Sequence, residues 1–190
     1  SGGVNVGKGG DIERLYGADR VQAMIEEAAE SYGHFERIIE RENIDCQYRR
    51  SGRFVGAHTP AAYAAMAARV ETLNAHAAAE ARLVPRDRQR EELGSDFYYG
   101  GMVVERAGGV HPSQYHQGLR RACRAAGVRL CANTAVEGID GKAGDLTVRT
   151  SRGAVRAREV VLGTNGHTGA ATPWFRRRVV PVGSYIITTE

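Results

Sequence analysis

The stretch Val160-Val161-Leu162-Gly163-Thr164-Asn165-Gly166 decides how the rest of the sequence is interpreted. The apolar run that ends at Gly163 follows charged residues and precedes small polar ones, which is typical of a strand covered on both faces of a parallel sheet. Gly163 and Gly166 allow close approach to the backbone, and Thr164 and Asn165 add hydrogen-bonding groups. Open α/β sheets bind cofactors at such strand ends. A plain strand-to-loop exit is the alternative.

Around this stretch, hydrophobic periodicity and turn residues predict a mixed α/β chain. A helix of about twenty residues is expected from Asp19, its N-cap, until Asn43 stops it. The predicted helices that follow span 61–79, after the Thr59-Pro60 cap, 83–93, and 112–126, ended by Gly127. The predicted strands are 47–58 (broken at Ser51-Gly52), 97–104, 128–131, 136–140, the hairpin 145–150 with 154–157, 159–163 and 179–189.

The composition of the chain argues against several classes of function. The 190 residues are 42% hydrophobic and 25% charged, as in ordinary globular proteins. No run of about eighteen apolar residues predicts a membrane span. The net charge of +4 is modest, and its arginines are spread along the chain, which favours a solvated surface over a nucleic-acid groove. The three cysteines form no C-x-x-C pair, so we expect no metal site, no disulfide framework and a cytoplasmic protein.

Several segments together resemble one family. A Gly-Gly turn at 108–109 leads through His111-Pro112, a helix, a strand and a polar hairpin to the 160–166 stretch. In this order the chain resembles the D-amino-acid-oxidase-like flavoproteins, which include glycine oxidase and sarcosine oxidase relatives. The segments 94–101 and 180–190 are most similar to the gamma-glutamylputrescine-oxidase-like branch. The resemblance implies an FAD-dependent oxidation of an amine or amino acid.

The resemblance also implies a domain order. Residues 1–45 match a loop and helix of an FAD-binding, Rossmann-like domain, and residues 46–110 match part of a β-rich substrate domain. Residues 111–175 return to the FAD-binding domain, and 176–190 begin a returning strand of the substrate domain. No G-x-G-x-x-G follows a strand in this sequence, so the pyrophosphate loop is expected upstream of Ser1. The opening Ser1-Gly2-Gly3 is then an internal cut or an expression scar.

Cofactor-binding residues follow from the resemblance alone. The family places the strand end against FAD, which implies contacts from Gly163, Thr164, Asn165 and Gly166. It also implies that Val136 meets the adenine end through its backbone, although Val136 by itself is an ordinary strand residue. A flavin-lining stretch is loosely matched at the glycine-rich start, which adds Asn5 and Gly7. A flexible chain end is the alternative there.

Substrate residues are less sharply indicated. Arg53 begins a substrate-domain strand by resemblance, and its guanidinium suits bidentate binding of a substrate carboxylate. Tyr99 is a candidate for the substrate cavity, and His167 directly follows the glycine-capped strand end. Their alternatives are core packing for Tyr99 and a solvent-facing or capping role for His167. No catalytic acid, base or nucleophile stands out, and no metal-binding spacing is present.

Two functions from different classes therefore stay open. The first is an FAD-dependent oxidoreductase that acts on a small amine or amino acid and is represented by an incomplete chain. The second is a non-catalytic fragment or paralogue that folds, as a dimer for example, without binding FAD tightly. A dehydrogenase that uses NAD is a weaker third alternative, because that cofactor also needs the glycine loop. Strand edges and apolar faces left without neighbours predict self-association.

Overall fold

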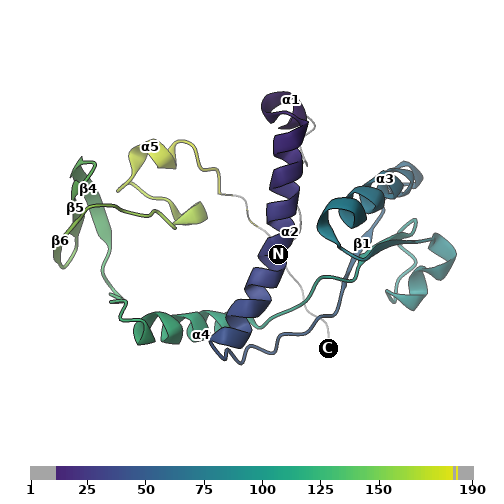
Figure 1. Cartoon of the computed structure of the whole chain (residues 1–190), viewed down its shortest axis with the longest axis horizontal. Helices are drawn as coiled ribbons and strands as arrows, with labels where there is room; N and C mark the ends of the chain where they lie inside the picture. Colours follow the sequence, from purple (N-terminus) through teal and green to yellow (C-terminus); the bar gives the residue numbers. More distant parts are fainter. Residues whose placement is uncertain (1–11, 182, 184–190) are drawn as a thin grey trace. The chain divides into compact units, whose positions relative to one another are not determined.

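The computed structural model describes residues 12–181 and 183 (Figure 1). Asn5 and Gly7, with the rest of the glycine-rich start, lie outside the described residues. The chain divides into two compact units, Ser1–Val128 (unit 1) and Arg129–Glu190 (unit 2), and each is described by itself. None of the described helices is both long and apolar enough to cross a bilayer.

The helices of unit 1 are α1 (Ile12–Tyr16), α2 (Ala18–Arg41), α3 (Pro60–Ala77) and α4 (Pro112–Ala125). Local signals predicted the last two correctly. The Thr59 hydroxyl accepts a hydrogen bond from the backbone N–H of Ala62 at 3.1 Å, and Pro60 follows as the first helical residue. Beyond α4, Gly127 takes a left-handed φ of 82° that ends the helix.

The predicted N-cap of α2 is wrong by two residues. Gly17, with φ 81°, occupies the cap, and Asp19 lies in the first helical turn. A carboxylate is also favourable there, because it faces the positive end of the helix dipole. The sequence signal therefore marked the correct turn of the helix but the wrong residue.

A three-stranded antiparallel sheet forms the centre of unit 1, with strand order β1 (Arg53–Gly56), β3 (Gly101–Val104), β2 (Ala81–Val84). Met102 of the middle strand lies opposite Val55 on one side and Leu83 on the other. One sheet face packs against α3, where Leu73, Ala77 and Met102 form a buried cluster. Fully burying such a side chain is worth about 1.5–3 kcal/mol.

The segment 97–104 is a strand only over its second half. Tyr99 N–H donates to the Ala57 carbonyl at 2.9 Å, and Gly100 turns the chain with φ 84°. A side chain at Gly100 would lie 2.5 Å from the Val84 carbonyl, so the turn requires glycine. The charged segment predicted as a helix at 83–93 instead contains the end of β2 and a 3-10 helix, η1 (Arg86–Glu91).

Unit 2 contains a second three-stranded antiparallel sheet, β4 (Val136–Lys142), β5 (Asp145–Thr150) and β6 (Gly153–Ala157). The predicted hairpin is confirmed: Val148 of β5 lies opposite Val155 of β6, and the chain turns at 151–152. Two short helices follow, η2 (Asn165–His167) and α5 (Pro173–Arg176).

Three predicted strands do not form in the described residues. Residues 128–131 and 159–163 are irregular, and so are 179–181 and 183. The predicted buried parallel strand is the main correction, because Val161 is 95% exposed and both sheets are antiparallel. A central strand needs hydrogen-bonded neighbours, and the described residues supply none to this segment. The mixed α/β class itself is confirmed.

Candidate functional site

A cavity of about 590 Å³ lies within unit 1 between two helices and the sheet. Its floor is the sheet face formed by Val55, Met102 and Val104. Leu73 of α3 and Phe35 of α2 contribute to its walls. Cavities of 300–1,000 Å³ with mostly apolar walls are the usual size for binding small molecules.

Three arginines from different elements contribute to the wall of this cavity. They are Arg53 in β1, Arg69 in α3 and Arg106 after β3. Arg106 donates from Nη1 to the Ala77 carbonyl at 3.4 Å and lies 5.7 Å from the ring centre of Tyr32. Among the described residues, the wall contains no Asp or Glu. The cavity therefore combines an apolar interior with a positive surround.

A hydrogen-bonded network borders the cavity and joins α2 to the segment that enters β1. Tyr48 donates from its hydroxyl to Glu36 Oε1 at 2.6 Å and lies 2.5 Å from the Tyr32 hydroxyl. Arg50 Nη2 donates to both oxygens of Glu36, at 2.9 and 3.0 Å. The hydrogen bond from Tyr48 holds the pKa of Glu36 below its ordinary value, with help from Arg50, although partial burial opposes the shift.

The Tyr48 hydroxyl is held in its protonated form. Burial, and then the hydrogen bond to Glu36, raises the pKa of Tyr48. Tyr48 is therefore a hydrogen-bond donor rather than a base at neutral pH. Gly108 fits tightly against this network, because a side chain there would lie 2.5 Å from the Arg49 carbonyl and 2.9 Å from the Tyr48 ring.

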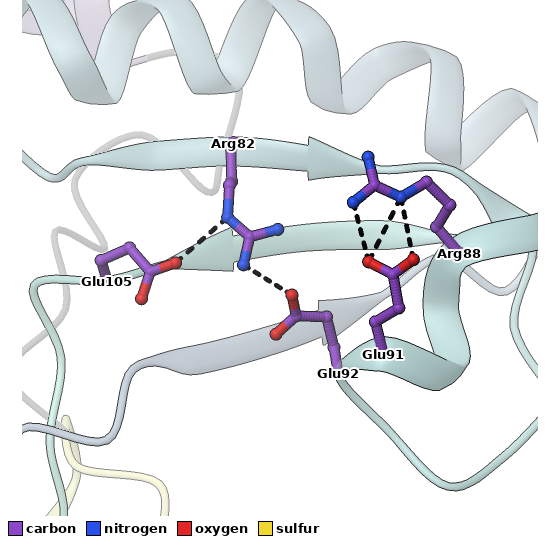
Figure 2. A network of polar contacts seen from close by, with 5 residues as sticks. All are labelled: Arg82, Arg88, Glu91, Glu92 and Glu105. Atoms are coloured by element: carbon purple, nitrogen blue, oxygen red, sulfur yellow. Dashed lines mark hydrogen bonds and ion pairs between the residues drawn. The ribbon is translucent and has the colours of Figure 1, made fainter.

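A separate charged cluster is centred on Arg82 of β2, in the same sheet. Figure 2 shows Arg82 between two carboxylates, with Nη2 donating to Glu92 at 2.6 Å and Nε donating to Glu105 at 3.1 Å. Arg88 and Glu91 pair beside it. Since Ala81 and the neighbouring Leu83 pack in the core cluster, Arg82 points to the opposite sheet face. These arginines are neutralised locally, unlike those of the cavity.

The structure brings together only some of the predicted substrate residues. Arg53 lines the cavity, whereas Tyr99 stacks with Arg86, whose guanidinium carbon lies 4.6 Å from its ring centre. Tyr99 does not line the cavity. His167 belongs to unit 2, where it is exposed within η2. Of the three predicted substrate residues, Arg53 is therefore the one that lines the cavity of unit 1.

The predicted cofactor residues of unit 2 form an open surface. Gly163, Thr164, Asn165 and Gly166 are contiguous and exposed, and no atom lies within 4 Å of where a Gly163 side chain would begin. The Thr164 hydroxyl lies 2.9 Å from that of Thr168. Pro181 lies near Gly166, where its Cβ would be 3.7 Å from an added side chain.

Val136 begins β4 in the same unit. It pairs with Thr150 of β5, and its side chain is 46% exposed. A register irregularity follows it between Val136 and Gly138.

Sequence reasoning missed most of the cavity. Arg69, Leu73 and Ala77 are spaced four residues apart on α3 and therefore lie on one helix face. An arginine on this apolar face could have predicted that the face lines a cavity. Arg106 and Tyr48 carried no such local pattern. His111 has the structural role of capping α4, since its Nδ1 accepts from the Gln114 N–H at 3.4 Å. The described residues contain no cluster that would hold a metal ion.

Comparisons with known proteins bear on this chain as a whole. A family model described as "FAD dependent oxidoreductase" (DAO) matches residues 2–190. Gamma-glutamylputrescine oxidoreductase of Escherichia coli is 30% identical over 180 residues, which are 94% of this chain and 42% of that protein. A probable oxidoreductase, OrdL, of Haemophilus influenzae is 33% identical over 113 residues, 57% of this chain and 26% of that protein.

Solved structures show the same fold at lower sequence similarity. Glycine oxidase from Geobacillus kaustophilus has a TM-score of 0.69 at 17% identity, over 79% of this chain and 42% of that one. L-proline dehydrogenase from P. horikoshii has a TM-score of 0.66 at 15% identity, over 76% of this chain and 39% of that one. The chain thus spans less than half the length of the proteins it matches.

Proposed function

Because this chain belongs to the family of FAD-dependent oxidoreductases, we propose that it forms part of an enzyme that oxidises the C–N bond of an amine or amino acid. The family match over residues 2–190 is the observation that carries this proposal. FAD would supply the redox chemistry when bound, as the acceptor of a hydride from the carbon next to nitrogen. The chain's own residues contribute binding and orientation.

The open segment of unit 2 is proposed to contact FAD. Gly163 leaves the backbone accessible, and the Thr164 and Asn165 side chains offer hydrogen bonds nearby. Val136 adds a backbone contact at the adenine end. For Asn5 and Gly7, which lie outside the described residues, the same role rests on the sequence resemblance alone. The exposure of the 163–166 segment supports this assignment, since a cofactor surface must be free of side-chain cover.

A substrate carboxylate is proposed to bind Arg53. A guanidinium offers paired N–H donors that match a carboxylate in charge and geometry. Arg53 lines the cavity of unit 1, which supports the role. Tyr99 and His167 remain weaker proposals for substrate contact. The domain order 1–45, 46–110, 111–175 and 176–190 also remains a proposal.

Two wider properties are proposed with the activity. We expect self-association, because apolar side chains such as Trp174 and Val180 are exposed on unit 2. A cytoplasmic location is favoured by three free cysteines, two of them exposed. Light scattering at high concentration tests the first property, and a strictly monomeric chain would contradict it.

The activity is tested in a hybrid protein, in which this chain replaces the matching stretch of the Escherichia coli relative. We expect the hybrid protein to copurify with FAD, and its flavin colour to bleach anaerobically when an amine substrate is added. The substrate panel takes its members from the names of the relatives: gamma-glutamylputrescine, glycine and L-proline. The unmodified relative is the control for flavin content.

A folded hybrid that stays colourless in excess FAD would contradict the proposal. Folding is judged from far-UV circular dichroism, compared with that of the unmodified relative. If the hybrid does not fold, the 190-residue chain is titrated with FAD while flavin fluorescence is recorded. Saturable quenching supports a contribution to the flavin site, and an unchanged signal counts against it.

A further inference from the structure

The exposed segment 163–166 of unit 2 contains a dipeptide with a chemistry of its own, Asn165-Gly166. The 190 residues contain five asparagines, and Asn165 is the one that a glycine follows. Both residues of the pair are exposed, so water reaches them. Within the described residues, the hydrogen bonds of Asn165 use its backbone carbonyl and leave its side-chain amide unpaired. This side chain is therefore free to turn toward the backbone.

The backbone nitrogen of Gly166 is accessible to that side chain. The Cγ of an asparagine and the next backbone nitrogen can close a succinimide ring, and the next side chain is the main obstacle to this closure. Glycine removes the obstacle. A side chain added at Gly166 would have Pro181 as its nearest neighbour, at 3.7 Å. Among the described hydrogen bonds, none uses the Gly166 N–H as donor, so no acceptor holds this nitrogen back.

The peptide bond between the two residues receives hydrogen bonds that favour the reaction. The Asn165 carbonyl accepts from the Thr168 N–H at 3.2 Å and from Thr168 Oγ1 at 2.6 Å. The Thr164 hydroxyl lies 2.9 Å from that of Thr168 and is the donor there, because the one Thr168 proton is already used. The Gly166 nitrogen attacks only after it loses its proton, which puts negative charge on the Asn165 carbonyl oxygen. Donors that point at this oxygen stabilise the charge.

We propose that Asn165 is a site of spontaneous deamidation, and that the hydroxyl groups of Thr164 and Thr168 promote the reaction. The Gly166 nitrogen forms a bond to Asn165 Cγ, the Cγ–Nδ2 bond breaks, and ammonia leaves with the proton from Gly166. Water then opens the succinimide. Cleavage of the new N–Cγ bond gives aspartate, and cleavage of the original peptide bond gives isoaspartate. One water is consumed and one ammonia released, without an oxidant or reductant.

The deamidation is a property of the chain, but its consequence rests on the proposed function, in which Asn165 contacts FAD. The product carries a carboxylate where the proposed contact had an amide. FAD carries two negatively charged phosphates, which this carboxylate repels. Isoaspartate also lengthens the backbone at the same point. An FAD-free protein is therefore expected to age into a form that binds the cofactor weakly, whereas bound FAD covers the segment and slows the ageing.

The first test measures the reaction without flavin. The 190-residue chain is incubated in mildly alkaline buffer, and mass spectrometry of its tryptic peptides follows the replacement of the amide by a carboxyl group. Asn133 is the matched control, because it is exposed in the same unit with φ 53° against 45° for Asn165, but Thr134 follows it. Asn165 should react at least about tenfold faster. Equal rates for the two asparagines would overturn the site.

Two glycine exchanges locate the cause. Gly166→Ala is tolerated, since the added carbon makes an ordinary contact with Pro181, and it should slow the reaction of Asn165 at least about tenfold. Thr134→Gly should raise the rate at Asn133. An unchanged Asn165 rate in Gly166→Ala would overturn the mechanism, as would an unchanged Asn133 rate in Thr134→Gly.

Variants of Thr168 test the hydroxyl donor. Thr168→Val removes it and should slow deamidation about three- to tenfold, which is the worth of one hydrogen bond. Thr168→Ser keeps the hydroxyl and should retain the rate of the unmodified chain. If valine leaves the rate unchanged or raises it, the promoting role of the hydroxyl is overturned. Circular dichroism confirms that both variants are folded.

The last test concerns the cofactor and uses the hybrid protein. Asn165→Asp should weaken FAD binding about tenfold, whereas Asn43→Asp, at an exposed asparagine of unit 1, should leave the dissociation constant unchanged. Excess FAD should also slow deamidation of Asn165 in the hybrid. Equal dissociation constants for the two variants would overturn the consequence for the cofactor. A hybrid that takes up no FAD while Asn165 still deamidates would remove the proposed function and leave the modification site standing.

Discussion

Each of the two units contains a three-stranded antiparallel sheet, but only the sheet of unit 1 has a buried apolar face. In unit 1, α3 covers the sheet, and Met102 is 1% exposed. In the described part of unit 2, no hydrophobic side chain is fully buried, and Val155 of β6 is 59% exposed. The same local architecture thus occurs with and without a core.

The contrast shows which residues are adapted to contacts beyond their own unit. Unit 2 exposes Val161, Leu162, Trp174 and Phe175. Exposed apolar groups that gather in one region mark surfaces for a ligand or for other polypeptide. We interpret unit 2 as a surface-forming piece of the protein and unit 1 as a self-supporting piece. The predictions that follow test this difference.

Truncation of the unit 1 core should have the largest effect. Met102→Ala is expected to lower the free energy of unfolding by about 2–5 kcal/mol, because it removes a buried side chain and leaves a cavity. Val155→Ala in unit 2 should change it by less than about 0.5 kcal/mol. Urea titration followed by far-UV circular dichroism measures the unfolding free energy of both variants, with the helices reporting unit 1 and the sheet signal reporting unit 2. Similar losses for the two variants would remove the contrast between the units.

A glycine in α4 should give an intermediate effect. A side chain at Gly118 would overlap Ile44, which is buried, so Gly118→Ala is expected to cost about 1–3 kcal/mol. Gly33→Ala in α2 meets only the flexible ends of Arg37 and Arg106. It should be neutral or stabilising by up to about 1 kcal/mol, because alanine favours helix. Shifts of opposite sign in the midpoint of thermal unfolding would confirm the close contact between Gly118 and Ile44. Stabilisation by both substitutions would contradict it.

Loss of the Glu36 network should have the smallest effect, and the effect should depend on pH. The folded-state pKa of Glu36 lies below its ordinary value of 4.5. The stability that ionised Glu36 contributes is therefore fully present above pH 4.5, and it is lost as the pH falls through the lowered folded-state pKa. Glu36→Gln should cost about 1 kcal/mol at pH 7 and less at pH 3, because the carboxylate is protonated first in the unfolded chain.

The matched control for this prediction is Glu40→Gln, one turn further along α2, where the side chain is exposed. Its unfolding free energy should stay close to that of the unmodified chain at both pH values. A penalty for Glu36→Gln that is the same at pH 7 and pH 3 would show that the carboxylate charge is not what Tyr48 and Arg50 stabilise.

Local signals predicted much of the fold. The Thr59-Pro60 cap, Gly127 and the turn before Gly153 each act within a few residues, and the corresponding helices and hairpin form. The strand predicted at 159–163 depended on partners elsewhere in a sheet, and in the described residues no strand pairs with it. Sequence periodicity reports that a segment suits burial, but it does not supply the neighbour that buries it.

The cavity was harder to predict for a related reason. Arg53, Arg69 and Arg106 are separated by 16 and 37 residues in the chain and line one cavity only when α3 packs on the sheet. Their convergence depends on tertiary structure. The 163–166 segment, by contrast, is a contiguous motif that the sequence alone singled out, although its contact with FAD remains a proposal.

The most direct test of the central claim is the affinity for FAD of two glycine variants of the hybrid protein. Gly163 and Gly94 are alike, since neither needs a left-handed φ and neither has an atom within 4 Å of a new side chain. Gly163→Val should weaken FAD binding at least about tenfold, because the side chain would occupy the space proposed for the cofactor. Gly94→Val should leave it unchanged. Equal dissociation constants for both variants would contradict the claim that the 163–166 segment contacts the flavin.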